Sequence, residues 1–440
     1  FALDANTTGI RNNAFGYNSL TNTTEGNSNN SFGVNALQQN TTGCCNVAMG
    51  QNALNANTTA SNNTAVGSYA LTANTTGANS AAFGFCALAS GTTANLNTAI
   101  GNFALRDTQN GCKNTAVGYQ SMLDATSADC NVALGAYSLA NNTSADLNTA
   151  LGACSMYTNA TGANNVAVGY GSLYSNTGSD NTAVGSGALD ANTSAVNNTA
   201  VGKNAMGANT TGHRNTSVGK DSMAVNTTGC CNVSVGWGSL GSNTTATGNT
   251  AVGAVALTSN TTGIKNAALG ESALYTNTTG CCNVAVGRQA LYANTTANDN
   301  TAVGNNALFA NTTGCQNTAL GFNTLATNIS GCQNVAIGMK ALDSQTTGTG
   351  NTALGNESLT VVTTGSYNTG TGWLAGVDVT TGSNNSFLGR DAGRTGSPGG
   401  SITTGNDTIV LGDEHVTDLF CADTSISSSD LRDKTDIEDF

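Results

Sequence analysis

A 17-residue repeat runs through nearly the whole chain and is the feature that most constrains its fold. The consensus is N-T-A-V-G-x-x-A-L-x-x-N-T-T-G-x-x, and we number its positions 1 to 17 from the first asparagine. Coils begin at Asn12 and continue in steps of 17 to Asn165, whose coil is one residue short; the register resumes at Asn181 and runs to Asn368. Because helical repeats need longer units, the period predicts an all-β, parallel β-solenoid. About 22 coils at the strand spacing of a sheet would make a rod about 105 Å long.

Each consensus position has a physical interpretation. Asparagine at position 1 predicts a ladder of side-chain amides from coil to coil, and glycine at position 5 predicts a corner. The deletion in the short coil falls within N-T-T-G, which is therefore predicted to be one of two turns between two short extended segments. Small residues at position 3 predict a close second packing surface. The core is predicted from position 4 (Phe15, Phe32, Met49, Val66, Phe83, Ile100) and from position 9 (Leu20, Leu37, Leu54, Leu71, Met122, Met156).

Composition limits what one such chain can do. Large apolar side chains are scarce, because much of the 38% apolar fraction is alanine, and an ordinary enzyme core is therefore excluded. Burial within one thin coil offsets little of the entropy lost on ordering it, so the sequence predicts a homotrimer with position 3 near a shared axis. The net charge of −12, without a basic stripe, argues against nucleic acid and anionic membranes as partners. No apolar run has membrane-spanning length, so no membrane insertion is expected.

The segments N-T-A-V-G, A-L and N-T-T-G resemble the β-roll repeat of trimeric autotransporter adhesin heads and the repeat arrays of phage tail fibres. The adhesin core reads N-S-V-A-I-G with a shorter period, so this chain departs from it in length and spacing. The resemblance implies a left-handed solenoid and a homotrimer.

The last residues carry a second resemblance. The stretch from Ser425 to Phe440 is similar to the opening of the intramolecular chaperone domain of phage tail spikes, tail fibres and endosialidases. That opening reads S-D-x-R-x-K-x-x-I, and the matching residues here are Ser429, Asp430, Arg432, Lys434 and Ile437. The resemblance implies self-cleavage between Ser429 and Asp430, with Ser429 as nucleophile and Lys434 as its partner. The alternative is that these residues form a solvated acidic tail.

These features divide the chain into three parts: a repeat shaft over 1–384 that starts in mid-coil, irregular terminal coils and a cap over 385–424, and the truncated start of a chaperone domain over 425–440. The chain is therefore expected to be a fragment of a longer protein.

Cysteines gather at positions 16 and 17. Cys315 and Cys332 occupy position 16 of successive coils, where a disulfide is geometrically allowed. Three vicinal pairs have no cysteine in adjacent coils and are predicted to join chains in a trimer: Cys44–Cys45, Cys230–Cys231 and Cys281–Cys282. The alternative is that all are reduced small residues in turns. No C-x-x-C occurs and His213 and His415 are isolated, so neither a metal site nor a cofactor is predicted.

The sequence as a whole predicts a structural protein without enzymatic activity beyond the suspected self-cleavage. The preferred interpretation is the shaft of a phage tail fibre or spike in a virion, with itself as partner and a host-surface glycan or protein as receptor. The alternative is a trimeric adhesin on a bacterial surface, and the third is an ice-binding solenoid. Exposed aromatic residues at positions 6 and 10, such as Tyr170, Tyr174 and Phe309, are candidates for stacking on sugars. The repeated N-T-T also matches the N-glycosylation pattern, although Asn and Thr are ordinary turn and ladder residues.

Overall fold

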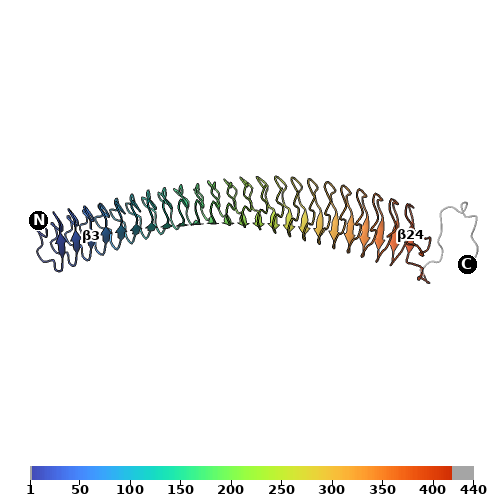
Figure 1. Cartoon of the computed structure of the whole chain (residues 1–440), viewed down its shortest axis with the longest axis horizontal. Helices are drawn as coiled ribbons and strands as arrows, with labels where there is room; N and C mark the ends of the chain where they lie inside the picture. Colours follow the sequence, from blue (N-terminus) through green and yellow to red (C-terminus); the bar gives the residue numbers. More distant parts are fainter. Residues whose placement is uncertain (1, 419–440) are drawn as a thin grey trace, which may run out of the picture.

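The computed structural model describes residues 2–418, which form one long, gently curved rod (Figure 1). The rod is a single parallel β-solenoid in which each coil contributes one strand, and 24 strands pair in chain order into one sheet. The predicted all-β solenoid with 17-residue coils is confirmed. Its handedness and its assembly into a trimer stay predictions.

Every strand has three residues, at positions 2 to 4 of its coil. The strands are β1 (Asn13–Phe15), β2 (Asn30–Phe32), β3 (Val47–Met49), β4 (Thr64–Val66), β5 (Ala81–Phe83), β6 (Thr98–Ile100), β7 (Thr115–Val117), β8 (Val132–Leu134), β9 (Thr149–Leu151), β10 (Val166–Val168), β11 (Thr182–Val184), β12 (Thr199–Val201), β13 (Thr216–Val218), β14 (Val233–Val235), β15 (Thr250–Val252), β16 (Ala267–Leu269), β17 (Val284–Val286), β18 (Thr301–Val303), β19 (Thr318–Leu320), β20 (Val335–Ile337), β21 (Thr352–Leu354), β22 (Thr369–Thr371), β23 (Ser386–Leu388) and β24 (Ile409–Leu411).

The repeat keeps each position stacked on its counterpart in the next coil. In β14 and β15, Val233 pairs with Thr250 and Val235 with Val252. The expectation of a second extended segment is wrong, because positions 6 to 17 form a succession of turns. These turns still stack through backbone hydrogen bonds, as where the N–H of Leu240 donates to the carbonyl of Ala256 at 3.0 Å.

The interior of the coil corrects the predicted core. Position 9 is fully buried, as expected. Position 4 points outward, however, and Phe15, Phe32, Met49, Phe83 and Ile100 are 39–75% exposed, with Val66 half-exposed. Position 3 fills the interior instead, with Ala48 and Ala65 among the fully buried residues, so the prediction that position 3 faces a second surface near a trimer axis is wrong. Because side chains alternate along a strand, positions 2 and 4 must then face away from the interior.

A narrow interior explains why position 3 is small. The only phenylalanine at this position, Phe387 of β23, is buried beside three glycines. Gly370 is its partner in β22, and a Cβ on Gly376 or Gly393 would overlap the Phe387 ring. A large side chain at position 3 is therefore accommodated where glycines beside it leave room, although its other partner, in β24, is Val410.

The corner at position 5 requires glycine on two grounds. Gly236 has φ +134°, a backbone conformation that residues with a Cβ rarely adopt. A Cβ there would also overlap the carbonyl oxygen of Gly253 in the next coil. The sequence prediction of a corner glycine is confirmed.

Two asparagine ladders run through the rod. At position 1, the backbone N–H and the side-chain amide of Asn46 donate to Oδ1 of Asn29 at 3.0 and 3.1 Å, which confirms the predicted ladder. A second ladder, which the repeat did not predict, runs along position 12, where Nδ2 of Asn57 donates to Oδ1 of Asn40 at 2.8 Å. Both Asn46 and Asn57 also donate to the carbonyl of Ala60. The ladders thus satisfy polar groups that the narrow interior removes from water.

One gap in the second ladder leads to a stability prediction. Gly91 occupies position 12, and the buried Oδ1 of Asn74 and Oγ1 of Thr108 on either side of it have no hydrogen-bond partner. We expect Gly91→Asn to satisfy both and to raise the free energy of unfolding by about 1–3 kcal/mol over Gly91→Ala. Denaturant unfolding of the two variants tests this, and equal stabilities would contradict it.

The coil-length irregularities lie in the turns and leave the sheet register intact. The short coil loses its residue between Asn176 and Gly178, and β10 still pairs with β11 through Val166 and Thr182. The deletion is therefore in the N-T-T-G turn, as predicted. The long coil after β23 bulges over residues 393–402, and Ser386 pairs with Ile409 beyond it.

Candidate functional site

The outward side chains at positions 2 and 4 of β1 to β24 form one continuous surface, which we call the exposed apolar face. Position 4 is Val, Leu, Ile, Phe or Met in every strand except β22, where it is Thr371. Position 2 is mostly Thr or Val, and neither position carries a charged residue in any of the 24 strands. Val168, Leu269 and Leu388 are 36%, 50% and 56% exposed.

The size of the exposed apolar face matches that of a protein interface. Twenty-four strands of three residues cover about 110 Å by about 10 Å, or about 1,100 Å². A stable interface needs about 800 Å² from each partner. The apolar part of the face comes mainly from position 4, because position 2 is Thr, Asn or Ser in 15 of the 24 strands. No segment within residues 2–418 lies across this face. The face is therefore the strongest candidate for a contact with another molecule.

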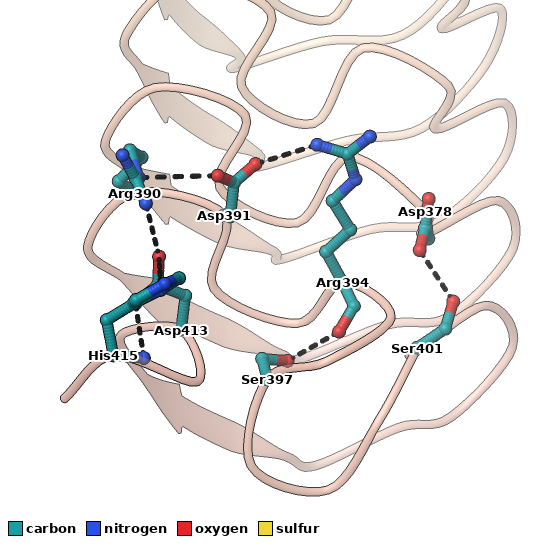
Figure 2. A network of polar contacts seen from close by, with 8 residues as sticks. All are labelled: Asp378, Arg390, Asp391, Arg394, Ser397, Ser401, Asp413 and His415. Atoms are coloured by element: carbon teal, nitrogen blue, oxygen red, sulfur yellow. Dashed lines mark hydrogen bonds and ion pairs between the residues drawn. The ribbon is translucent and has the colours of Figure 1, made fainter. Parts of the chain in front are cut away.

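A polar network closes the C-terminal end of the described solenoid (Figure 2). Arg390, which follows β23, donates to Asp413, which follows β24, at 2.8 Å and lies 3.4 Å from Asp391. Arg394 contacts the same Asp391 at 2.9 Å, and Oγ of Ser401 donates to Asp378 at 2.7 Å. The network surrounds a hollow of about 450 Å³ below the bulge of the long coil. It ties the bulge to the last strand and acts as a cap.

The electrostatics of this cap lead to a pH prediction. The hydrogen bond from Arg390, followed by that from the backbone N–H of His415, lowers the pKa of Asp413 to about 2. A carboxyl group whose pKa is lowered on folding stabilises the fold above its unfolded pKa of about 4, and this stabilisation is lost as the pH falls through about 2. We expect Arg390→Gln to move the NMR titration midpoint of Asp413 towards 4. An unchanged midpoint would show that Arg390 is not the cause.

Among the predicted cysteine pairs, the structure brings two sulfurs together within one chain. The Sγ atoms of Cys315 and Cys332 are 3.1 Å apart and unbonded. The hydrogen bond between the two thiols is the main reason that the pKa of the Cys315 thiol is raised, and partial burial raises this pKa further. In the vicinal pairs, position 16 (Cys44, Cys230, Cys281) is half-buried and position 17 (Cys45, Cys231, Cys282) is exposed, so each pair has one thiol open to another molecule.

We expect mild oxidation to join Cys315 and Cys332 within one chain, because adjacent coils hold them in register. Peptide mass spectrometry without reductant would show the linked peptides. Joining of the vicinal pairs between chains stays a prediction, for which denaturing gels with and without reductant give the answer. If Cys315 and Cys332 both remain alkylatable after oxidation, the intrachain bridge is wrong.

The self-cleavage residues Ser429 and Lys434 lie outside the described residues, as do Asp430, Arg432 and Ile437. Within residues 2–418, no three His, Cys, Asp or Glu side chains are grouped as a metal site would require. The same stretch contains no helix of the length and hydropathy that would cross a bilayer.

The aromatic side chains form stacks that the sequence analysis did not foresee. Seven rings follow one another along one side of the rod, each 5.1–6.3 Å from the next, in the order Tyr69, Phe85, Phe103, Tyr119, Tyr137, Tyr157, Tyr174. A second stack joins Tyr275, Tyr292 and Phe309, with centroids 5.1 Å apart. The available signal was the coil register, which places positions 6, 7 and 10 of successive coils beside one another. The same signal would have found the Arg390–Asp413 pair, since both residues follow the corner glycine of their coil.

No family model matches this chain, and no curated protein sequence matches it.

Proposed function

We propose that this chain is the shaft of a phage tail fibre or tail spike, assembled as a homotrimer through the exposed apolar face. The shaft holds an attachment end, which recognises a glycan or protein of the host surface, away from the virion. The observation that carries the proposal is the uncharged apolar face along all 24 strands.

Symmetry favours a closed assembly of three chains around this face. Successive strands pair without any shift in register, and the face is nearly uniform in composition. Copies aligned along the rod axis would therefore bury it over its whole length. Burying this face, about 1,100 Å² per chain, removes the position-4 side chains from water and so adds to the little apolar area buried in the alanine-lined interior of a single coil. Cyclic symmetry closes the assembly and leaves none of this face exposed.

The similarity of Ser425–Phe440 to the opening of a phage chaperone domain supports the phage assignment over the bacterial adhesin. The gene segment that follows Phe440 distinguishes them: an autochaperone domain supports the fibre, and a membrane anchor supports the adhesin.

In the extended protein, Lys434→Arg should stop release of a fragment beginning at Asp430 without preventing trimer assembly, because arginine does not serve as a base. Release at the normal rate would show that Lys434 is not the base.

Light scattering tests the assembly directly. A fibre shaft should have three times the chain mass of 43.8 kDa and appear as a straight or gently curved rod by electron microscopy. A folded particle of single-chain mass would overturn the trimeric shaft.

A specific observation also favours the ice-binding alternative. Threonine occupies position 2 in half of the strands and points outward on a flat sheet, rather than lying only in turns. The column is interrupted by valine, as at Val132, Val166 and Val233, and the trimer would bury the same face. Thermal hysteresis measured beside the mass separates the two functions: a monomer that depresses freezing supports ice binding, and an inactive trimer supports the shaft.

A further inference from the structure

Two hollows on the flank of the rod each contain an aromatic ring, a carboxylate and an amide. Each lies beyond the corner glycine, among positions 6, 7, 10 and 11, and so on a different side of the coil from the exposed apolar face. The first has a volume of about 440 Å³ and the second about 490 Å³. Each occurs where a stack of aromatic rings ends, with its last ring at position 10.

In the first hollow, the last ring of the stack has one face free. Tyr174 stacks on Tyr157 with an interplanar angle of 10°. The next residue in the position-10 column is Asp190, whose side chain is too small to continue the stack. Successive glycines at position 7, Gly171 and Gly187, open the floor, and a Cβ on Gly171 would contact nothing within 4 Å.

The polar groups around this ring have unused hydrogen-bonding capacity. The carboxylate of Asp190 takes part in no hydrogen bond or ion pair with residues 2–418, and partial burial raises its pKa. Asn204 lines the hollow at position 7, where its Nδ2 donates to Asp221 at 3.2 Å and its Oδ1 accepts no hydrogen bond from residues 2–418. Tyr170, 67% exposed, also lines the hollow. An aromatic face beside a free carboxylate and an amide suits a ligand with one apolar face and several hydroxyl groups.

The second hollow lies eight coils further on and contains the same kinds of group at different coil offsets. Phe309 ends the stack of Tyr275 and Tyr292, and Ala326 follows it in the position-10 column. The carboxylate of Asp343 and the amide of Asn323 lie at the far side, and burial raises the pKa of Asp343, partly offset by Lys340. A terminal ring, a carboxylate and an amide thus line both hollows, although the carboxylate lies one coil beyond the ring in the first and two coils beyond it in the second.

We propose that these two flank hollows bind neutral oligosaccharides, with a pyranose ring stacked on the free face of Tyr174 or Phe309 and its hydroxyls donating to Asp190 or Asp343. The net charge of −12 disfavours anionic glycans. At the strand spacing of the sheet, the hollows lie about 40 Å apart, so one long glycan or a glycan-coated surface can engage both. The inference does not depend on the shaft proposal, because neither hollow uses the exposed apolar face.

Binding of immobilised neutral hexasaccharides of glucose, galactose, mannose and N-acetylglucosamine tests the proposal, with sialylated and sulfated oligosaccharides as the anionic set. We expect at least one neutral sugar to bind at millimolar concentration or tighter. The double variant Tyr174→Ala/Phe309→Ala should weaken binding at least about 10-fold, because the stacking surface is lost. Asp190→Asn/Asp343→Asn should weaken it less, because an amide still accepts a hydrogen bond.

Trp237→Ala is the matched control, since Trp237 is 58% exposed at position 6 but lines neither hollow. It should bind as the unmodified protein does. Binding of anionic sugars alone, no binding of any neutral sugar, or binding that survives loss of both rings overturns the proposal. The mass of each variant, measured in parallel, reports separately on the trimer.

Discussion

Replacing the corner glycine Gly236 by alanine should lower the free energy of unfolding by more than about 3 kcal/mol. The new Cβ overlaps the carbonyl oxygen of Gly253, which belongs to the backbone and cannot rotate away. The substitution also forces alanine to adopt φ +134°, a backbone conformation outside the regions open to residues with a Cβ. Because each coil contacts only its neighbours, the damage should centre on β14 and β15. Thermal unfolding by circular dichroism and proteolysis mapped by mass spectrometry measure both effects.

Gly238→Ala, two residues away, is the matched control. Gly238 has φ +61°, a region that alanine enters at a cost of about 1 kcal/mol. A Cβ there would lie 3.5 Å from Cγ1 of Val255, an ordinary contact. If the two variants lose equal stability, close approach between coils is not what requires glycine at position 5.

If the proposed trimer forms through the exposed apolar face, placing charges on that face should separate it into folded single chains. In the variant Val168→Asp/Val235→Asp/Leu269→Asp, three carboxylates from each chain would face their counterparts without water. Like charges brought together in an interface cost several kcal/mol, so association should weaken by at least about 10³-fold. Light scattering should fall from three times 43.8 kDa to that mass, with the circular dichroism spectrum retained.

The control variant carries the same three charges on another side of the rod. Thr161, Thr228 and Thr262 are exposed at position 14, so changing them to aspartate should leave the mass unchanged. Dissociation of both variants would point to net charge rather than to the face. A trimer that survives the apolar-face variant would remove that face from the interface.

The repeat predicted the sheet because strand register follows directly from the period. The consensus asparagine at position 1, glycine at position 5 and leucine at position 9 have one role each, and these roles are confirmed by Asn46, Gly236 and Leu20. The structure reverses the predicted inward and outward sides of the strand, because the larger side chain of each strand, at position 4, does not fit inside the coil. A coil of 17 residues encloses so little space that alanine, not valine, faces inward, as the three glycines around Phe387 show.

The flank hollows were beyond the sequence analysis for a different reason. The sequence shows Tyr174 and Phe309 as exposed aromatic residues. Whether such a ring has a free face, however, depends on where its stack ends. That in turn depends on the neighbouring coils, on Gly171 and Gly187 in one case and on Ala326 in the other. The pattern lies in the residues that occupy one repeat position in successive coils, not in the order of residues along the chain.

The retained register around the short coil and the long coil bears on how such a rod changes over generations. Turns accept a lost residue at 176–178 and a bulge at 393–402, while strand pairing continues unaltered on both sides. Recombination between near-identical coils therefore adds or removes whole coils without creating a misfit at the junction. Each event would alter the reach of the protein by about 4.8 Å. Length becomes a heritable quantity that selection can adjust in small equal steps, separately from whatever the two ends of the rod are built to do.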